Sequence, residues 1–272
     1  MLPEGFAARM RALLGSEYED FLASFDRPLC TGLRRNPLKT GFTGDLSRFS
    51  LSPVPWCPTG FYYDAVSRPG LSPYHAAGLY YLQEPSAMAP AELLDPQPGE
   101  RVLDLCAGSG CIGLAVASQV LRSRVLLGEW DEEALKVCRQ NIRRNQLSAR
   151  VTSLRMDARE KPSRQLGEFD CIVSNPPYIP TADIETLDPS VRDHEPHLAL
   201  DGGADGLDFY RVIADKWRDA LLPNGLMAFE VGIGQADEVL RIMRANGFGD
   251  IQIVKDLHGI PRVVYGRLCK EI

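Results

Sequence analysis

The feature that most constrains the fold is a regular alternation of short apolar runs with helical stretches from residue 101 onward. Parallel strands must be joined by crossover connections, which are usually helices. The alternation therefore predicts an α/β fold with a mostly parallel sheet and helices on both faces. The expected strands are Arg101–Leu105, Val125–Glu129, Val151–Met156, Phe169–Ser174 and Leu226–Val231, and the expected helices are Ile112–Leu121, Glu132–Asn145, Leu207–Leu222 and Gln235–Asn246.

The two ends of the chain depart from this alternation. Ile251–Val254 and Arg262–Arg267 are β-like runs with too few residues between them for a crossover, so we expect an antiparallel pair at one edge of the sheet. Residues 1–100 are rich in aromatic residues and prolines, which predicts short strands and turns after one opening helix near Phe6–Phe25. We therefore expect an accessory region over residues 1–75 and a larger domain over residues 76–272.

Charge and hydropathy narrow the class of protein. The chain has 30 Lys plus Arg and 36 Asp plus Glu, a net charge of −6, which argues against overall electrostatic attachment to nucleic acid but does not exclude a local basic groove. No apolar run approaches the roughly 18 residues of a membrane span, and no signal-peptide pattern opens the chain, so we expect a cytoplasmic protein without a membrane partner. The cysteines are scattered, odd in number and without a CxxC pair, which favours buried free thiols. They are Cys30, Cys57, Cys106, Cys111, Cys138, Cys171 and Cys269.

A glycine-rich turn follows the first expected strand. Gly108, Gly110 and Gly113 fit the pattern GxGxxG between that strand and a helix, where glycines let the backbone approach a ligand at a helix N-terminus. The second expected strand ends in Glu129, whose carboxylate could accept hydrogen bonds from both hydroxyls of a ribose. The pattern predicts a site for a nucleotide-derived cofactor, with a nicotinamide enzyme and a ligand-free turn as the alternatives.

The most specific motif is Asn175-Pro176-Pro177-Tyr178, directly after the fourth expected strand. Two prolines fix the backbone and remove two N–H donors, so the loop offers acceptors: the side-chain oxygen of Asn175 and the carbonyl of Pro176. Such a pair suits a substrate NH₂ group held by both hydrogens. A structural turn would explain the two prolines but not a rigid acceptor pair beside a nucleotide site.

With this motif the sequence resembles the S-adenosylmethionine-dependent amino-methyltransferases, and more narrowly the release-factor glutamine N5-methyltransferases. The resemblance covers about residues 102–267. It includes His194–Leu200, Gly202–Arg211, Phe229–Gly232 with Gln235, and Lys255–Val264. It implies a class I, Rossmann-like methyltransferase fold with a mostly parallel seven-stranded sheet and an antiparallel C-terminal hairpin.

The resemblance also implies roles for individual residues. Asp104, Gly108 and Gly110 would line the methionine part of S-adenosyl-L-methionine, Glu129 would bind its ribose, and Tyr178 would cover the substrate amide. The substrate would be a peptide chain release factor, methylated on the glutamine of its GGQ motif, and no metal would be needed. The full cofactor set is Asp104, Cys106, Ala107, Gly108, Ser109, Gly110, Glu129, Trp130, Asp157, Ala158 and Asn175, with Asp157 and Ala158 beside the adenine; the catalytic set is Asn175, Pro176, Pro177 and Tyr178.

One spacing suggests a metal site, which we do not expect. His194 and His197 are spaced as HxxH, but Glu195-Pro196 between them breaks helical geometry.

The front of the chain resembles a different family, the Sun-type ribosomal RNA cytosine-C5 methyltransferases. The similar stretches are Leu13–Tyr18, Gly32–Asn36, Val54–Cys57 and Gly78–Met88, and the similarity ends near Leu105-Cys106-Ala107. We find no counterpart of the helical bundle that precedes the core in glutamine methyltransferases. A fusion joined within the first expected strand, with a ribosomal RNA contact through the front region, follows as a hypothesis.

Chemistry separates the two resemblances. Methylation of cytosine C5 needs a cysteine thiolate that adds to the base. This chain has Pro176-Pro177 and Gly232-Ile233-Gly234 where that family carries its cysteines. The sequence therefore favours amide methylation, with methylation of an exocyclic amine on RNA and a noncatalytic binding module as the remaining alternatives.

Overall fold

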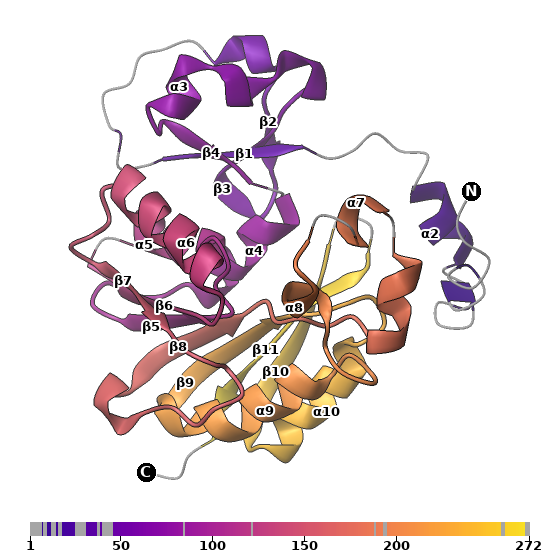
Figure 1. The fold of residues 1–272 in the computed structure, drawn as a ribbon. Helices are drawn as coiled ribbons and strands as arrows, with labels where there is room; N and C mark the ends of the chain where they lie inside the picture. Colours follow the sequence, from indigo (N-terminus) through magenta and orange to yellow (C-terminus); the bar gives the residue numbers. More distant parts are fainter. Residues whose placement is uncertain are drawn as a thin grey trace. The chain divides into compact units, whose positions relative to one another are not determined.

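In a computed structural model, the described residues are 7, 10–11, 15, 18–24, 31–36, 39, 46–83, 85–120, 122–187, 189–192, 195–256 and 259–269. They form two compact units, which are described separately (Figure 1). The first unit comprises Leu29–Ala158 and Gln165–Ser174. The second unit comprises Met1–Pro28, Arg159–Arg164 and Asn175–Ile272.

The first unit begins with a small antiparallel sheet of order β2-β3-β1-β4. Leu33, Phe49 and Tyr80 are almost fully buried beneath it. The short strands and turns expected here are confirmed. The elements are β1 (Gly32–Arg35), η2 (Ser47–Phe49), β2 (Ser52–Val54), β3 (Cys57–Tyr62), η3 (Ala65–Ser67), η4 (Pro69–Leu71), α3 (Pro73–Ala76) and β4 (Tyr80–Leu82).

A buried ion pair joins this small sheet to the helix that follows it, α4 (Pro85–Leu94). Arg34 of β1 is 2% exposed; its Nη2 lies 2.5 Å from Glu92 Oε1, and its Nε donates to Thr59 Oγ1 at 3.2 Å. Cys57 Sγ donates to the same Glu92 oxygen at 3.2 Å. Because a buried charge is costly without a partner, this cluster ties the front sheet and α4 together.

The rest of the first unit is a parallel sheet in which β5 lies between β8 and β6, and β6 pairs with β7. Helix α5 is buried from Ile112 to Ser118 and contacts β5 and β6, and α6 contacts β6 and β7. Helix α6 begins after Asp131, whose carboxylate accepts the Ala134 N–H at 2.8 Å. The elements are β5 (Arg101–Leu105), α5 (Cys111–Gln119), β6 (Arg124–Glu129), α6 (Glu132–Arg144), β7 (Val151–Arg155), η5 (Arg164–Leu166) and β8 (Phe169–Ser174).

The second unit is built on three antiparallel strands, with β11 between β9 and β10. Helix α10 contacts β10, β11 and α9. Tyr210 of α9 packs edge-on against Phe229 of β9, with ring centroids 5.4 Å apart. The elements are α2 (Tyr18–Ser24), η6 (Thr181–Thr186), α7 (Pro189–Arg192), α8 (His197–Leu200), α9 (Asp208–Lys216), η7 (Trp217–Ala220), β9 (Leu221–Glu230), α10 (Ala236–Ala245), β10 (Phe248–Lys255) and β11 (Pro261–Leu268).

The seven strands β5 to β11 follow the order β10-β11-β9-β8-β5-β6-β7. The mostly parallel sheet and the antiparallel hairpin at one edge are both confirmed.

Three local expectations were wrong. Helix α4 was not predicted, because Pro90 lies within it and a proline inside a helix removes a hydrogen bond. The helix expected to run to Leu222 ends earlier, and β9 already begins at Leu221, because Pro223 disfavours helical geometry in the residue before it. Gly15 has a φ of +51°, which interrupts the opening helix; Phe6 and Phe25 lie outside the described residues.

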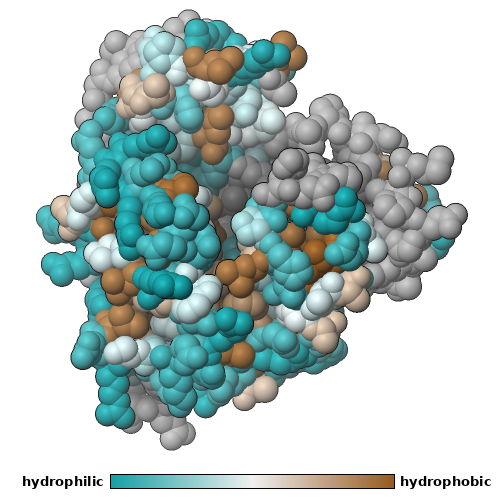
Figure 2. Space-filling model, in the orientation of Figure 1, coloured by the Kyte–Doolittle hydropathy of each residue, from teal (hydrophilic) through white to brown (hydrophobic). Residues whose placement is uncertain are grey.

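Hydrophilic residues predominate on the face shown in Figure 2, with apolar residues in small groups. Within the described ranges, no helix is long and apolar enough to cross a membrane. The same residues contain no group of three or more His, Cys, Asp or Glu that could hold a metal ion; His194 lies outside them. Six cysteines are described, and none of them is in a disulfide. Burial holds for Cys57, Cys138 and Cys171, whereas Cys106 is partly buried, Cys111 and Cys269 are exposed, and Cys30 falls outside the described residues.

Candidate functional site

The glycine-rich turn leaves β5 and enters α5 through backbone conformations that glycine favours. Gly108 and Gly110 have φ angles of +54° and +84°. A Cβ built at Gly108 would meet no atom within 4 Å, so the loop backbone is open there. Cys106 also has a positive φ, +57°, and burial raises the pKa of its thiol to about 12. The thiol is therefore protonated near neutral pH and is not a nucleophile.

The third glycine of the motif has a packing role. The Gly113 N–H donates to Asp104 Oδ2 at 2.9 Å, and a Cβ at this position would lie 2.3 Å from Leu127 Cδ2. Only glycine therefore lets α5 approach β6 this closely while its N–H binds the carboxylate.

Asp104, predicted to bind the methionine part of S-adenosylmethionine, is a buried carboxyl group with one oxygen that accepts no hydrogen bond from the described residues. It is 1% exposed, and its Oδ1 has no hydrogen-bond partner among the described residues. Burial, reinforced by repulsion from Glu129, raises the pKa of Asp104 to about 7. A buried acceptor without a partner beside an open glycine turn is the kind of group that a ligand donor or cation satisfies.

Glu129, the predicted ribose ligand, is held by the backbone. Its Oε2 accepts the Gly108 N–H and its Oε1 accepts the Asp131 N–H, both at 2.8 Å. Each carboxylate oxygen retains a further acceptor position. The structure thus brings Glu129 to the glycine turn in a fixed orientation that could bind two hydroxyls.

The residues predicted to lie around the adenine follow β6 and β7. Trp130 is 42% exposed; the Arg155 guanidinium lies 4.5 Å from its ring centroid, and Arg155 Nε donates to the Trp130 carbonyl at 3.2 Å. Ala158 is buried and Asp157 half-buried. The pKa of Cys106 is raised mainly by burial and in small part by the charge of Asp157. Asp157 and Cys106, both predicted to line the cofactor site, therefore lie near each other.

The Asn175–Tyr178 loop starts where β8 ends. Ser174 is fixed there, because its backbone is in register with Leu105 and its Oγ donates to the Leu105 carbonyl at 2.8 Å. Asn175 is exposed, Pro176 and Pro177 are buried, and Tyr178 is half-buried. An exposed amide next to two buried prolines is thus carried on a rigid strand end.

The residues that hydrogen-bond to the backbone of Tyr178 and Ile179 were not predicted from the sequence. Gln235 Nε2 donates to the Tyr178 carbonyl at 2.8 Å, and the Ile179 N–H donates to the Leu200 carbonyl at 2.9 Å. Gln235 stood among the residues that carry the resemblance, but no local pattern shows that a residue so distant in sequence reaches the loop.

The residues of the first unit fit S-adenosylmethionine. The unpartnered oxygen of Asp104 suits the positively charged methionine part, the fixed carboxylate of Glu129 suits the ribose, and the open backbone at Gly108 allows close approach. The same turn could accept other nucleotide cofactors. The similarity to known proteins, given next, distinguishes S-adenosylmethionine from them.

Two family models match, one on each side of residue 86. Residues 2–85 match the N-terminal domain of 16S rRNA methyltransferase RsmF, and residues 87–202 match the methyltransferase small domain. The first match confirms the expected resemblance of the front region to a ribosomal RNA methyltransferase, and the second confirms the expected methyltransferase domain. The models meet before β5, earlier in the chain than the join expected near Leu105.

Solved structures of the same fold cover nearly the whole chain. A methyltransferase homolog protein from Pyrococcus horikoshii has a TM-score of 0.66 and 19% identity, over 98% of this chain and 95% of that one. NSun6 from Pyrococcus horikoshii, solved with SFG, has a TM-score of 0.76 and 13% identity over 99% of both chains. These structures establish a class I methyltransferase fold.

Relatives that are similar in sequence are named release factor glutamine methyltransferases. The protein of that name from Caulobacter vibrioides is 45% identical over 61% of this chain but only 56% of the relative. The one from Geobacter sulfurreducens is 37% identical over 95% of this chain and 87% of the relative, so the similarity extends into the front region, for which we expected no counterpart. The cofactor of the family is S-adenosylmethionine. The chain belongs to the release factor glutamine methyltransferase family.

Proposed function

We propose that this protein transfers the methyl group of S-adenosylmethionine to the side-chain amide nitrogen of a glutamine in a peptide chain release factor. The observation that carries this proposal is the exposed Asn175 followed by buried Pro176 and Pro177 at the fixed end of β8. The substrate is the one for which its relatives are named. Such a substrate acts in translation, which would put the reaction in the cytoplasm.

The loop would act by orientation. Asn175 Oδ1 and the Pro176 carbonyl would each accept one N–H of the substrate carboxamide, which leaves the nitrogen lone pair directed away from both acceptors. Neither proline has an N–H that could compete for those acceptors. Tyr178 would then cover the amide, and the nitrogen would release a proton as its new C–N bond forms, so that no covalent enzyme intermediate is needed.

The cofactor would lie against the first unit. Asp104, Gly108 and Gly110 would contact its methionine part, with Cys106, Ala107 and Ser109 lining the same turn. Glu129 would bind the ribose, and Trp130, Asp157 and Ala158 would surround the adenine. When bound, S-adenosylmethionine supplies an electrophilic methyl group on its sulfonium. A nicotinamide reaction lacks comparable support, because the relatives reported above are named as methyltransferases.

Asn175→Ala tests the proposal. The variant should lose at least about 100-fold in transfer of labelled methyl to release factor, because one of two amide acceptors is missing. Calorimetry should show S-adenosylmethionine affinity within a few fold of the wild type. A release factor with its GGQ glutamine replaced by glutamate should take up no label. Unchanged turnover by Asn175→Ala would refute the amide-binding mechanism.

A contact with ribosomal RNA is the second candidate, favoured by the match of residues 2–85 to the RsmF N-terminal domain. On this proposal residues 1–75 are an accessory region for recruitment and residues 76–272 carry the reaction. Cytosine C5 methylation is not part of it, because Pro176-Pro177 and Gly232-Ile233-Gly234 provide no thiol. RNA binding that survives at about 0.15 M salt would support the contact, and its loss there would count against it.

A further inference from the structure

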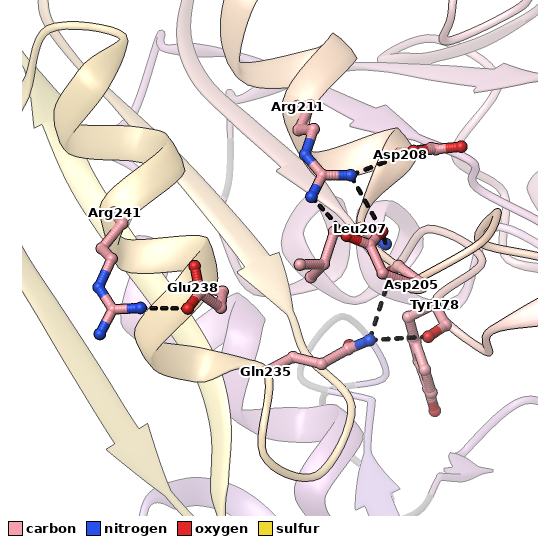
Figure 3. Close-up of polar contacts among 9 residues, drawn as sticks. Tyr178, Asp205, Leu207, Asp208, Arg211, Gln235, Glu238 and Arg241 are labelled. Atoms are coloured by element: carbon pink, nitrogen blue, oxygen red, sulfur yellow. Dashed lines mark hydrogen bonds and ion pairs between the residues drawn. The ribbon is translucent and has the colours of Figure 1, made fainter.

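One side-chain amide joins three segments of the second unit that are far apart in sequence. Gln235, the residue before α10, is half-buried. Its Nε2 donates to the carbonyls of Tyr178 and Gly206, at 2.8 and 3.3 Å, and its Oε1 accepts the Gly232 N–H at 3.0 Å. Figure 3 shows the Gln235 side chain reaching the Tyr178 backbone from the start of α10.

The orientation of this amide is set by its partners. The NH₂ group faces two carbonyl oxygens and the amide oxygen faces an N–H, so a flipped amide would put like groups together. A glutamate of the same shape would keep the bond to Gly232 but place a carboxylate oxygen against the Tyr178 carbonyl. The site therefore requires the donor as well as the length of glutamine.

Three glycines leave room for Tyr178, two beside its backbone and one beside its ring. A Cβ at Gly202 would lie 2.8 Å from Tyr178 Cα, and one at Gly206 would lie 2.3 Å from the Tyr178 carbonyl oxygen. A Cβ at Gly232 would lie 2.9 Å from Tyr178 Cδ2. Each distance is shorter than real Cβ contacts allow, so glycine is needed at all three places for the loop to sit as it does.

The residues after Tyr178 are held by a short backbone ladder. The Ile179 N–H donates to the Leu200 carbonyl at 2.9 Å, and the Ile179 carbonyl accepts the Gly202 N–H at 2.8 Å. The Thr181 N–H donates to the Gly203 carbonyl at 2.9 Å. The loop is thus fixed on its C-terminal side by the 200–203 segment and by Gln235, and on its N-terminal side by Ser174 of β8.

The segment that follows Gly202 and Gly203 also carries an ion pair, but this pair does not hold Tyr178. Arg211 pairs with Asp205 at 2.5 Å and Asp208 at 3.2 Å, and the Leu207 N–H donates to Asp205 at 3.1 Å (Figure 3). The ion-paired side chains are about half exposed, and exposed ion pairs contribute little to stability. Tyr178 is therefore held in place by Gln235 and by close packing against Gly202, Gly206 and Gly232.

We propose that Gln235 is a positioning residue for methyl transfer. Its amide fixes the Tyr178 carbonyl. Because Pro176 and Pro177 have restricted backbone angles, a fixed Tyr178 also limits the positions of the Pro176 carbonyl and the Asn175 side chain. This inference rests on the proposed amide-binding role of that loop. A displacement of about 1 Å in such acceptors can lower a rate by about 100-fold, while cofactor binding in the first unit need not change.

Two pairs of variants test this, each with a matched control. Gln235→Glu removes both donated hydrogen bonds, and Glu238→Gln changes an exposed residue of α10 that pairs with Arg241. Gly206→Ala drives a methyl group into the Tyr178 carbonyl at a φ of +75°. Gly247→Ala has a similar φ, +84°, but meets no atom within 4 Å, so it carries the same backbone strain without touching the loop.

The readouts are kcat and KM for release factor, and S-adenosylmethionine affinity by calorimetry. We expect Gln235→Glu and Gly206→Ala to lower kcat by about 10- to 100-fold with cofactor affinity within about twofold, and both controls to match the wild type. Hydrogen exchange at the Ile179 and Thr181 amides should rise only in the two test variants. If Gln235→Glu does not fold, Gln235→Met takes its place, because methionine has a similar length and no donor for the Tyr178 and Gly206 carbonyls.

The outcomes separate this inference from the proposed function. If the wild type methylates release factor and Gln235→Glu keeps its kcat, Gln235 does not position the loop, whatever the result for Gly206→Ala. A kcat loss shared by Gly247→Ala would assign the effect to general strain and would also overturn the inference. If the wild type transfers no methyl group to release factor, the proposed function itself fails.

Discussion

Replacing Asp104 by asparagine should make the stability of the cofactor-free protein less dependent on pH. The pKa of this carboxyl rises from an ordinary 3.8 to about 7 in the folded protein, because it is buried and lies near Glu129. Ionisation is therefore more costly in the folded than in the unfolded chain. The favourable contribution of the protonated group is complete below about pH 4 and is lost progressively as the pH rises to about 7.

The size of the effect follows from the two pKa values. A change from 3.8 to about 7 corresponds to about 4 kcal/mol when the group is fully ionised in both states. Roughly half of this is lost below about pH 5.5, which leaves about 2 kcal/mol to be lost between about pH 5.5 and pH 8.5. The Asn variant has no proton to lose, and its amide oxygen can still accept the Gly113 N–H that Asp104 accepts at 2.9 Å.

Urea unfolding without cofactor, at about pH 5.5 and about pH 8.5, measures this change. The free energy of unfolding of Asp104→Asn, relative to wild type, should rise by about 2 kcal/mol between the two pH values. Asp219→Asn is the control, because Asp219 is exposed, and its difference from wild type should stay the same. A pH-independent difference for Asp104→Asn would show that burial does not disfavour the Asp104 carboxylate.

Two further changes test the packing around the site. Glu92→Ala should lower the free energy of unfolding by about 3–5 kcal/mol in urea, because it leaves the 2% exposed Arg34 as an unpaired buried charge; a loss below about 1 kcal/mol would mean that the pair is dispensable. Gly113→Ala should lower it by about 1–3 kcal/mol and weaken S-adenosylmethionine binding in calorimetry, because its Cβ would lie 2.3 Å from Leu127; wild-type stability and affinity together would contradict close packing there.

Much of the fold could be predicted from the sequence because its pattern is local. The strands Arg101–Leu105 and Phe169–Ser174 coincide with their predicted bounds, since each is an apolar run that ends at glycines or prolines. Helix α4 could not be predicted, because tertiary contacts such as the Arg34–Glu92 pair support a segment in which Pro90 disfavours a helix.

The candidate site likewise contains residues that a local sequence pattern reveals and contacts that only the folded chain reveals. Residue type and spacing indicated Glu129 and Asn175, because a strand end followed by an acid or by two prolines is visible in the chain itself. The unsatisfied oxygen of Asp104 depends on what surrounds it after folding. The contact of Gln235 with Tyr178 joins residues 57 apart, and no local pattern encodes it.

The central claim is that the chain methylates a glutamine side chain in a release factor. The most direct test presents purified release factor and ribosomal RNA together, with methyl-labelled S-adenosylmethionine, and maps the labelled product by mass spectrometry. We expect one added methyl group on the side-chain nitrogen of the GGQ glutamine, and none with Asn175→Ala. Label on RNA alone, or on the release factor at any other residue, would contradict the claim.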